Sequence, residues 1–191
     1  MNMNDLVGTW EVPLYDKIHK IQFEHGTTTG RRVLWIDNDI ILKKEWMFKL
    51  VGSEPFEIKN PDSDEIYAKC EIVINACLGF TYEYILYVNG KQFKTFREKQ
   101  SKIMRAWHFD LNNDEFRVVL EKDTLDVWVN GQKKDTTHEF GDSEGTEIKF
   151  NLDEQQQNCG CIKTISSGDK RKGMIYVLEV NGQSVNEKDV E

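Results

Sequence analysis

Apolar and polar residues alternate along much of this chain, and the clearest case lies in its second half. Phe116, Val118 and Leu120 occupy every second position, and the polar residues Arg117 and Glu121 fall beside them. Because successive side chains of a β-strand point to opposite faces, this period of two is typical of a strand with one buried face. The pattern therefore predicts a half-buried strand here.

Turn signals follow that strand closely. Lys122-Asp123 is a polar turn, and residues 125–129 have the pattern of a returning strand. Asn130-Gly131 comes next and favours positive φ at both central positions of a two-residue hairpin turn. The same dipeptide recurs at Asn89-Gly90 and Asn181-Gly182. We therefore expect a β-meander and three tight hairpin turns.

Further strands are expected at shorter stretches of apolar and β-branched residues. They lie at residues 9–12, 18–25, 32–36, 46–51, 70–74 and 82–88. Loops are expected at residues 25–30, around Pro55, over the acidic stretch 59–65 and in the hairpin connection 166–173. Because no long helical crossover separates the strands, the sheets should be antiparallel and pack as two-layer sandwiches or small barrels.

The second half of the chain repeats the first. Trp107 follows Trp10 by 97 positions (107 − 10), and at the same spacing Val118 takes the place of Ile21 on the buried face. Identical residues recur at this spacing in the pairs Leu14 and Leu111, Glu24 and Glu121, and Thr27 and Thr124. Near the ends, residues 176–182 repeat the pattern of residues 84–90 at a spacing of 92.

This repeat predicts an all-β protein of two tandem antiparallel β-sandwich or barrel-like domains related by internal duplication. The first domain should span residues 1–95 and the second residues 104–191. Between them, residues 96–103 are charged and lack β alternation, so this linker could be a short helix or an extended segment.

Charge and the absence of targeting signals narrow the classes of partner and compartment. The 191 residues carry a formal net charge of −8, which argues against general affinity for nucleic acid or anionic lipid. The N-terminal residues lack the apolar core of a signal peptide, and no apolar run is long enough to span a bilayer. We therefore expect a cytoplasmic protein that does not insert in membranes, with its four cysteines reduced and buried as small apolar residues.

Cys159 and Cys161 are the strongest candidate for a chemical site. Two thiolates this close could hold a metal ion only with further ligands, and no second cysteine pair or histidine pair lies at a suitable spacing. A redox role for the pair is a second interpretation. Since positions two apart on a strand share a face, two buried structural thiols are the interpretation that we favour.

Other residue types that support catalysis occur without the arrangement that catalysis needs. No nucleophile elbow and no phosphate loop is present. Asp123 and Asp126 could form a carboxylate pair, but they lie in and beside a predicted turn rather than along a cleft. The histidines are dispersed, at His19, His25, His108 and His138. We therefore expect no enzyme, and we assign no catalytic, cofactor-binding or metal-binding residues and no cofactor.

The tryptophans and two other stretches leave further alternatives open. The tryptophans could include a sugar-stacking platform, but their partial recurrence in the repeat favours a role in the core. They are Trp10, Trp35, Trp46, Trp107 and Trp128. The basic loop at 166–173 could contact an anion or an acidic partner, although its place in a hairpin favours solvated lysines. Gly8-Thr-Trp10 is similar to the Gly-x-Trp signature of lipocalins and fatty-acid-binding proteins, but the duplication leaves halves too short for such a barrel.

Several stretches, in order along the chain, are familiar from one family. They are Trp10-Glu-Val12, His19-Lys-Ile21, Phe23-Glu-His-Gly-Thr-Thr28, Lys44-Glu-Trp-Met-Phe-Lys-Leu-Val-Gly52, Tyr82-Glu-Tyr84, Val119-Leu-Glu-Lys-Asp-Thr-Leu-Asp-Val-Trp128 and Ser166-Ser-Gly168. Together they resemble the Fas apoptotic inhibitory molecule family over nearly the whole chain. The chain departs from the family's pattern at Ile36-Asp37-Asn38, where the turn usually carries glycine, and in the acidic stretch 60–65.

The resemblance implies a non-enzymatic cytosolic regulator that inhibits Fas death-receptor apoptosis and modulates survival signalling through protein–protein interaction. Its partners would be components of death-receptor or survival signalling, and self-association stays open. The resemblance also implies a role in restraining aggregation, so a holdase-like protein that binds misfolded chains is the main alternative. A small-ligand carrier or lectin is a third class. Exposed apolar surface would favour the holdase, a deep apolar cavity the carrier, and a compact polar patch the regulator.

Overall fold

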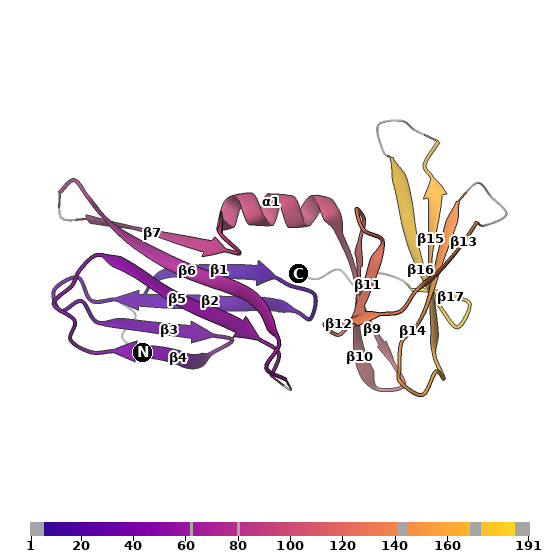
Figure 1. The fold of residues 1–191 in the computed structure, drawn as a ribbon, viewed down its shortest axis with the longest axis horizontal. Coiled ribbons are helices and arrows are strands. Elements are labelled where there is room, and N and C mark those ends of the chain that lie inside the picture. The colour runs from indigo at the N-terminus through magenta and orange to yellow at the C-terminus, as the bar shows by residue number, and fades with distance from the viewer. Residues whose placement is uncertain (1–5, 62, 80, 141–144, 169–172, 186–191) are drawn as a thin grey trace. The chain divides into compact units, whose positions relative to one another are not determined.

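The fold is almost entirely β-strand, with one helix (Figure 1). The structure, a computed structural model, describes residues 6–61, 63–79, 81–140, 145–168 and 173–185. The chain divides into two compact units. The first comprises Met1–Leu14 and Ile18–Gln100, and the second comprises Tyr15–Lys17 and Ser101–Glu191. The prediction of an all-β protein is confirmed.

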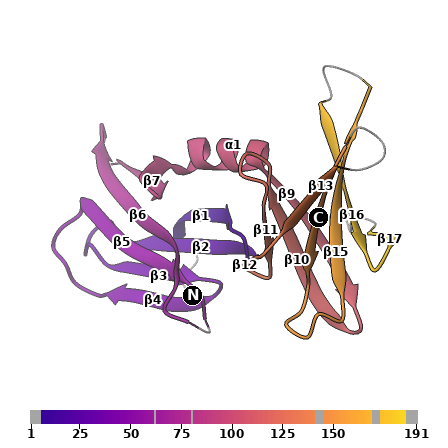
Figure 2. The same cartoon turned by 45° about the vertical axis from the view of Figure 1, so that its right-hand side comes forward.

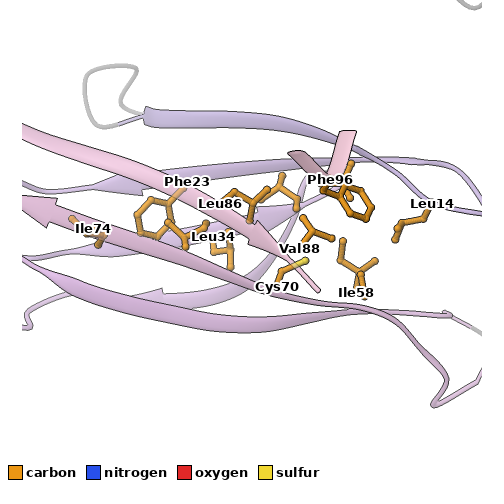
Figure 3. Packing of buried hydrophobic residues seen from close by; sticks show 13 residues of the cluster. Leu14, Phe23, Leu34, Ile58, Cys70, Ile74, Leu86, Val88 and Phe96 are labelled. Carbon is orange, nitrogen blue, oxygen red and sulfur yellow. The ribbon is translucent and has the colours of Figure 1, made fainter. Parts of the chain in front are cut away.

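The first unit is a sandwich of two antiparallel sheets, with strand orders β1-β2-β3-β4 and β5-β6-β7-β8. The strands are β1 (Leu6–Pro13), β2 (Ile18–His25), β3 (Arg32–Ile36), β4 (Asp39–Lys44), β5 (Gly52–Lys59), β6 (Ile66–Cys77), β7 (Thr81–Val88) and β8 (Lys91–Gln92). Phe23 and Leu34 of one sheet share a core with Leu86 and Val88 of the other (Figure 3). Each of these side chains is at most 1% exposed, and burying one stabilises the fold by roughly 1.5–3 kcal/mol.

The second unit also contains two antiparallel sheets, with strand orders β12-β11-β10-β9 and β13-β14-β15-β16-β17 (Figure 2). The strands are β9 (Met104–Leu111), β10 (Asp114–Glu121), β11 (Asp126–Val129), β12 (Gln132–Lys134), β13 (Thr137–Phe140), β14 (Thr146–Asn151), β15 (Cys159–Ser166), β16 (Met174–Val180) and β17 (Gln183–Ser184). Trp107, Val118, Ile148 and Leu178 lie in its buried core.

The first sheets of the two units have the same strand order, since β1 to β4 are joined one after another as β9 to β12 are. Trp10 of β1 lies opposite Ile21 of β2, and Trp107 of β9 lies opposite Val118 of β10. In the sequence repeat, Trp107 corresponds to Trp10 and Val118 corresponds to Ile21. The second sheets differ, because β13 adds a strand that the first unit lacks among its described residues. Descent from one duplicated domain stays a prediction.

The three Asn-Gly turns are confirmed. Both residues of each turn have positive φ: 48° and 75° at Asn89-Gly90, 48° and 82° at Asn130-Gly131, and 50° and 78° at Asn181-Gly182. The connection 166–173 joins β15 to β16 as predicted, although residues 169–172 lie outside the described part of the chain.

Three local predictions are wrong. Residues 46–51 form a loop rather than a strand, and a strand that the sequence did not suggest, β4, precedes them. Pro55 lies within β5 rather than in a loop. An edge strand such as β5 tolerates proline, because it leaves one row of backbone N–H groups without a ladder partner. Leu125 has a φ of 61° and belongs to the turn, so β11 begins at Asp126.

The predicted linker lies in helix α1 (Phe93–Ile103), so its residues are helical rather than extended. Phe96 on this helix is buried in the core of the first unit. The boundaries of the two domains stay a prediction. The helix, the only one in the described residues, is too short and too polar to cross a membrane.

Candidate interaction site

A buried ion pair joins the two sheets of the first unit. Arg32, the first residue of β3, donates a hydrogen bond from Nη1 to Oε1 of Glu54 in β5 at 2.6 Å. Lys44 of β4 donates from Nζ to the other carboxylate oxygen of Glu54, also at 2.6 Å. Arg32 and Glu54 are 1% and 2% exposed. Because both charges have lost their water, each depends on the other for compensation.

The second guanidinium nitrogen of Arg32 holds the loop at residues 45–51, which we call the aromatic loop. Its Nη2 donates to the backbone carbonyl oxygens of Lys49 at 2.9 Å and of Val51 at 3.0 Å. Gly30 leaves room for this approach. A Cβ at that position would lie 3.0 Å from the Lys49 carbonyl oxygen, and its φ of +70° strains other residue types. Arg32 therefore fixes the end of the loop.

The first half of the aromatic loop is bound to the residues just before Arg32. The backbone N–H groups of Met47 and Phe48 donate to the carbonyl oxygen of Thr29 at 3.2 and 3.3 Å. Arg31 places its Nε 3.3 Å from a carboxylate oxygen of Glu45. Both halves of the loop are thus held by the segment that leads into β3.

The aromatic loop presents two rings to solvent. Trp46 is 68% exposed and Phe48 83% exposed, and their ring centroids lie 5.8 Å apart. Phe48 has a φ of 51°, a conformation that costs a bulky residue on the order of 1–2 kcal/mol. Such strain persists only where the surrounding contacts impose it. The contacts of Arg32 and Thr29 supply that constraint, and they hold an aromatic pair outside the core.

Further apolar surface adjoins the aromatic loop along the chain. Ile40 and Ile41 of β4, an edge strand in the described sheet, are both exposed. On the other side of the loop, a hollow of about 570 Å³ begins at Val51 and Gly52 and continues over the outer face of β5 and β6. Clustered exposed apolar residues of this kind mark interaction surfaces in soluble proteins. We therefore take the aromatic loop, the exposed isoleucines of β4 and this hollow as the candidate interaction site.

The cysteine pair differs from its prediction in one respect. Cys159 and Cys161 share a face of β15, as expected, but Cys159 is exposed and Cys161 half-buried, because Gly160 and Ile162 take the inward positions. Burial, with Glu147 nearby, raises the pKa of the Cys161 thiol, so the structure does not activate it. Of the four cysteines only Cys70 is buried, and burial raises its pKa to about 12.

The remaining titratable candidates lie in separate places. His19 contacts Asp37, His25 contacts Tyr84, His108 contacts Arg117 and His138 contacts Thr136. Asp126 pairs with Lys133 at 2.7 Å, while Asp123 lies exposed in the turn before β11. Within the described ranges, no three histidine, cysteine or acidic side chains gather in a way that could hold a metal ion.

The tryptophans divide between the core and the surface. Trp107 and Trp35 are buried, and Trp10 and Trp128 are half-buried. A core role is wrong for Trp46, which belongs to the aromatic loop. In the sequence, the apolar residues around Trp46 have the pattern of a buried strand. The partners that bend the chain there, Arg32 and Glu54, lie elsewhere in the sequence, so no local signal reveals the loop.

Comparison with known proteins gives a consistent result over nearly the whole chain. Residues 6–188 match the family model described as Fas apoptotic inhibitory molecule. The chain is 48% identical to Fas apoptotic inhibitory molecule 1 of Bos taurus, over 97% of this chain and 88% of the relative. It is 46% identical to the Mus musculus protein of the same name and 45% identical to that of Homo sapiens, over 97% of this chain and 98% of each relative. The chain therefore belongs to the Fas apoptotic inhibitory molecule family.

Proposed function

We propose that this protein inhibits cell death triggered through Fas by binding proteins of death-receptor or survival signalling. It acts in the cytoplasm and catalyses no reaction. The names of its relatives supply the process. The aromatic loop supplies the observation for the binding mode, because it exposes Trp46 and Phe48 on a backbone that is already ordered.

Such a loop suits protein recognition for two physical reasons. Aromatic side chains, tryptophan above all, carry a large share of the energy at protein interfaces. A loop that the fold has already fixed loses little further conformational entropy when a partner binds. The strain at Phe48 agrees with this interpretation, since a purely structural loop would gain from glycine there.

The test uses cells that express the full-length chain and are challenged with Fas ligand. The double variant Trp46→Ala/Phe48→Gly removes both rings, and its glycine accepts the positive φ at position 48. We expect wild-type protein to raise survival and the double variant to lose that protection at equal expression, although its melting temperature is no lower than that of the wild type.

Leu78→Ala is the matched control. Leu78 is 99% exposed in the turn between β6 and β7, so this variant also removes an exposed apolar side chain. It should protect cells as the wild type does. If the Trp46→Ala/Phe48→Gly chain is folded and protects fully, the aromatic loop is not the binding site.

The exposed edge of β4 favours a second candidate function, the capture of unfolded chains. Ile40 and Ile41 lie on a strand with one unpaired edge in the described sheet, and an extended polypeptide can add to such an edge. Light scattering by reduced insulin tests this candidate. Wild-type protein should suppress the scattering, and Ile40→Lys/Ile41→Lys should suppress it less. Equal suppression by the variant would argue against capture at β4.

A further inference from the structure

We propose that the aromatic loop takes a partner segment in which an acidic side chain lies next to an aromatic or aliphatic one. The carboxylate would lie at Lys49, and the apolar side chain in the hollow that begins beside it. This inference rests on the proposed function and adds the chemistry of the partner to it.

The charges around the aromatic loop single out Lys49. Lys43 pairs with Glu45 at 2.7 Å, and Lys44 pairs with buried Glu54 at 2.6 Å. Lys49 is exposed, and within the described ranges no carboxylate pairs with it. It directly follows Phe48 in sequence, so the same loop carries the exposed rings and a cation without a paired carboxylate. In a chain with a net charge of −8, such a cation gives an acidic segment a defined place to bind.

The position of the Lys49 side chain connects it to the hollow. A Cβ built on Gly52 would lie 3.4 Å from Nζ of Lys49, so the amine of Lys49 lies next to Gly52. Gly52 and Val51 line the hollow at this end, together with Val73 of β6. The hollow's carboxylate, Glu71, lies farther along the sheet, since Glu71 pairs with Pro55 whereas Gly52 pairs with Ile74. A partner would therefore meet a cation and then an apolar surface.

This order of groups discriminates between segments. An acidic group followed by an apolar one is complementary to Lys49 and Val73. A basic group in the same place would meet a like charge, which disfavours the complex. An apolar segment without charge would cover the rings and leave Lys49 without a counter-charge. Charge at the rim thus sets which partner binds, while the rings supply most of the affinity.

Selection from a displayed library of random 12-residue peptides tests the proposal on the full-length protein. Wild-type protein should enrich peptides in which Asp or Glu adjoins an aromatic or aliphatic residue. Against a selected peptide, Lys49→Glu should weaken binding roughly fivefold. Trp46→Ala should weaken it roughly thirtyfold. Replacing the peptide's acidic residue with Lys should restore binding to Lys49→Glu.

Lys91→Glu is the matched control, because Lys91 is an exposed lysine of β8 and the variant makes the same change in net charge. It should bind the selected peptide as wild type does. Peptides without acidic preference, an absence of enrichment, or equal losses in Lys49→Glu and Lys91→Glu would each overturn the proposal. The cell-survival test is separate. Protection that depends on Trp46 and Phe48 but not on Lys49 would leave the proposed function standing and refute only the acidic partner.

Discussion

Arg32 is the residue on which the aromatic loop depends most. Its guanidinium donates to Glu54 and to two backbone carbonyls of the loop, in three directions at once. Lysine has the same charge but lacks a planar fork of donors, so it could not make this set of bonds from one position. The residue joins the ion pair that connects the sheets to the loop that we propose for binding.

Removing the counter-charge of Arg32 should be severely destabilising. Glu54→Gln keeps the shape of the side chain but leaves buried Arg32 without its carboxylate, which we expect to cost about 3–5 kcal/mol. Urea unfolding of the full-length chain measures the loss. Glu57→Gln, in the same strand but in an exposed pair with Lys59 at 3.4 Å, should change stability by less than about 1 kcal/mol. Equal midpoints for the two variants would show that the buried pair is not needed.

His25 is a second buried polar residue near Arg32. It lies opposite Arg32 across the β2–β3 pair, its Nδ1 shares a 2.8 Å hydrogen bond with the hydroxyl of Tyr84, and its ring packs against Tyr82. Burial, and then the charge of Arg32, lowers the pKa of His25 below its usual 6.5. The folded protein thus binds a proton at this ring less readily than the unfolded chain does.

This lowered pKa gives the acid dependence of stability a defined sign. The stability that neutral His25 contributes is fully present above the pKa of 6.5 that the residue has in the unfolded chain. This stability is lost as the pH falls from there through the lower pKa of the folded protein. His25→Asn should therefore lose less stability than wild type between about pH 7 and pH 5. Urea midpoints at both pH values measure this slope. The prediction fails if His25→Asn keeps the wild-type slope.

At the scale of elements, four hairpin turns share one pattern of hydrogen bonds, in which an Asn or Asp of the turn bonds an adjacent strand through both its backbone and its side chain. Asn130 donates its backbone N–H to the carbonyl of Arg117, and its side-chain oxygen accepts the N–H of the same residue. Asn89, Asn181 and Asp37 bond the neighbouring strand in the same way. Each turn is thereby joined to a third strand. The turn at Asp37-Asn38 makes the same pair of bonds without a glycine.

The contribution of the side-chain hydrogen bond to the stability of such a turn can be measured by comparing two asparagines. Asn130→Ala and Asn113→Ala both place alanine at positive φ, since the native φ values are 48° and 73°. Only Asn130 has a described side-chain bond to an adjacent strand. Asn130→Ala should therefore cost about 0.5–1.5 kcal/mol more than Asn113→Ala. Thermal unfolding compares them, and equal losses would mean that the side-chain bond adds nothing to the turn.

Strands such as β2, β3, β7 and β10 could be predicted from sequence, because period-two alternation and Asn-Gly turns are local signals. The strand β4 could not, since its turn at Asp37-Asn38 has no glycine and its isoleucines Ile40 and Ile41 are exposed. The aromatic loop could not be predicted for a different reason. Its shape is imposed by Arg32 and Glu54, and an apolar run gives no sign of a buried ion pair elsewhere.

At the scale of the whole molecule, the internal repeat indicates two similar units, and each described unit has its own core. Where one unit ends is harder to infer. Residues 96–103 have the charged composition of a linker, yet Phe96 is only 5% exposed and contributes to the first core. A single apolar residue in a charged helix is a weak signal, and only packing reveals its role.

Fragments test this placement of Phe96. A fragment of residues 1–103 should melt cooperatively, whereas a fragment of residues 1–95 should be less stable by about 3–5 kcal/mol, the usual cost of losing a buried phenylalanine. In the full chain, Phe96→Ala should show a similar loss in the first unit, and exposed Arg97→Ala should not. Equal stability of the two fragments would place α1 outside the first domain.

The way in which the aromatic loop is held makes it a conformational epitope. Its rings lie within a few residues of each other, but the groups that position them come from Thr29, Arg31 and Arg32 before the loop, and from Glu54 through its pairing with Arg32. A synthetic peptide of residues 44–52 would contain the rings without any of these supports. Such a peptide should neither compete with the protein for a partner nor elicit antibodies that recognise the folded loop.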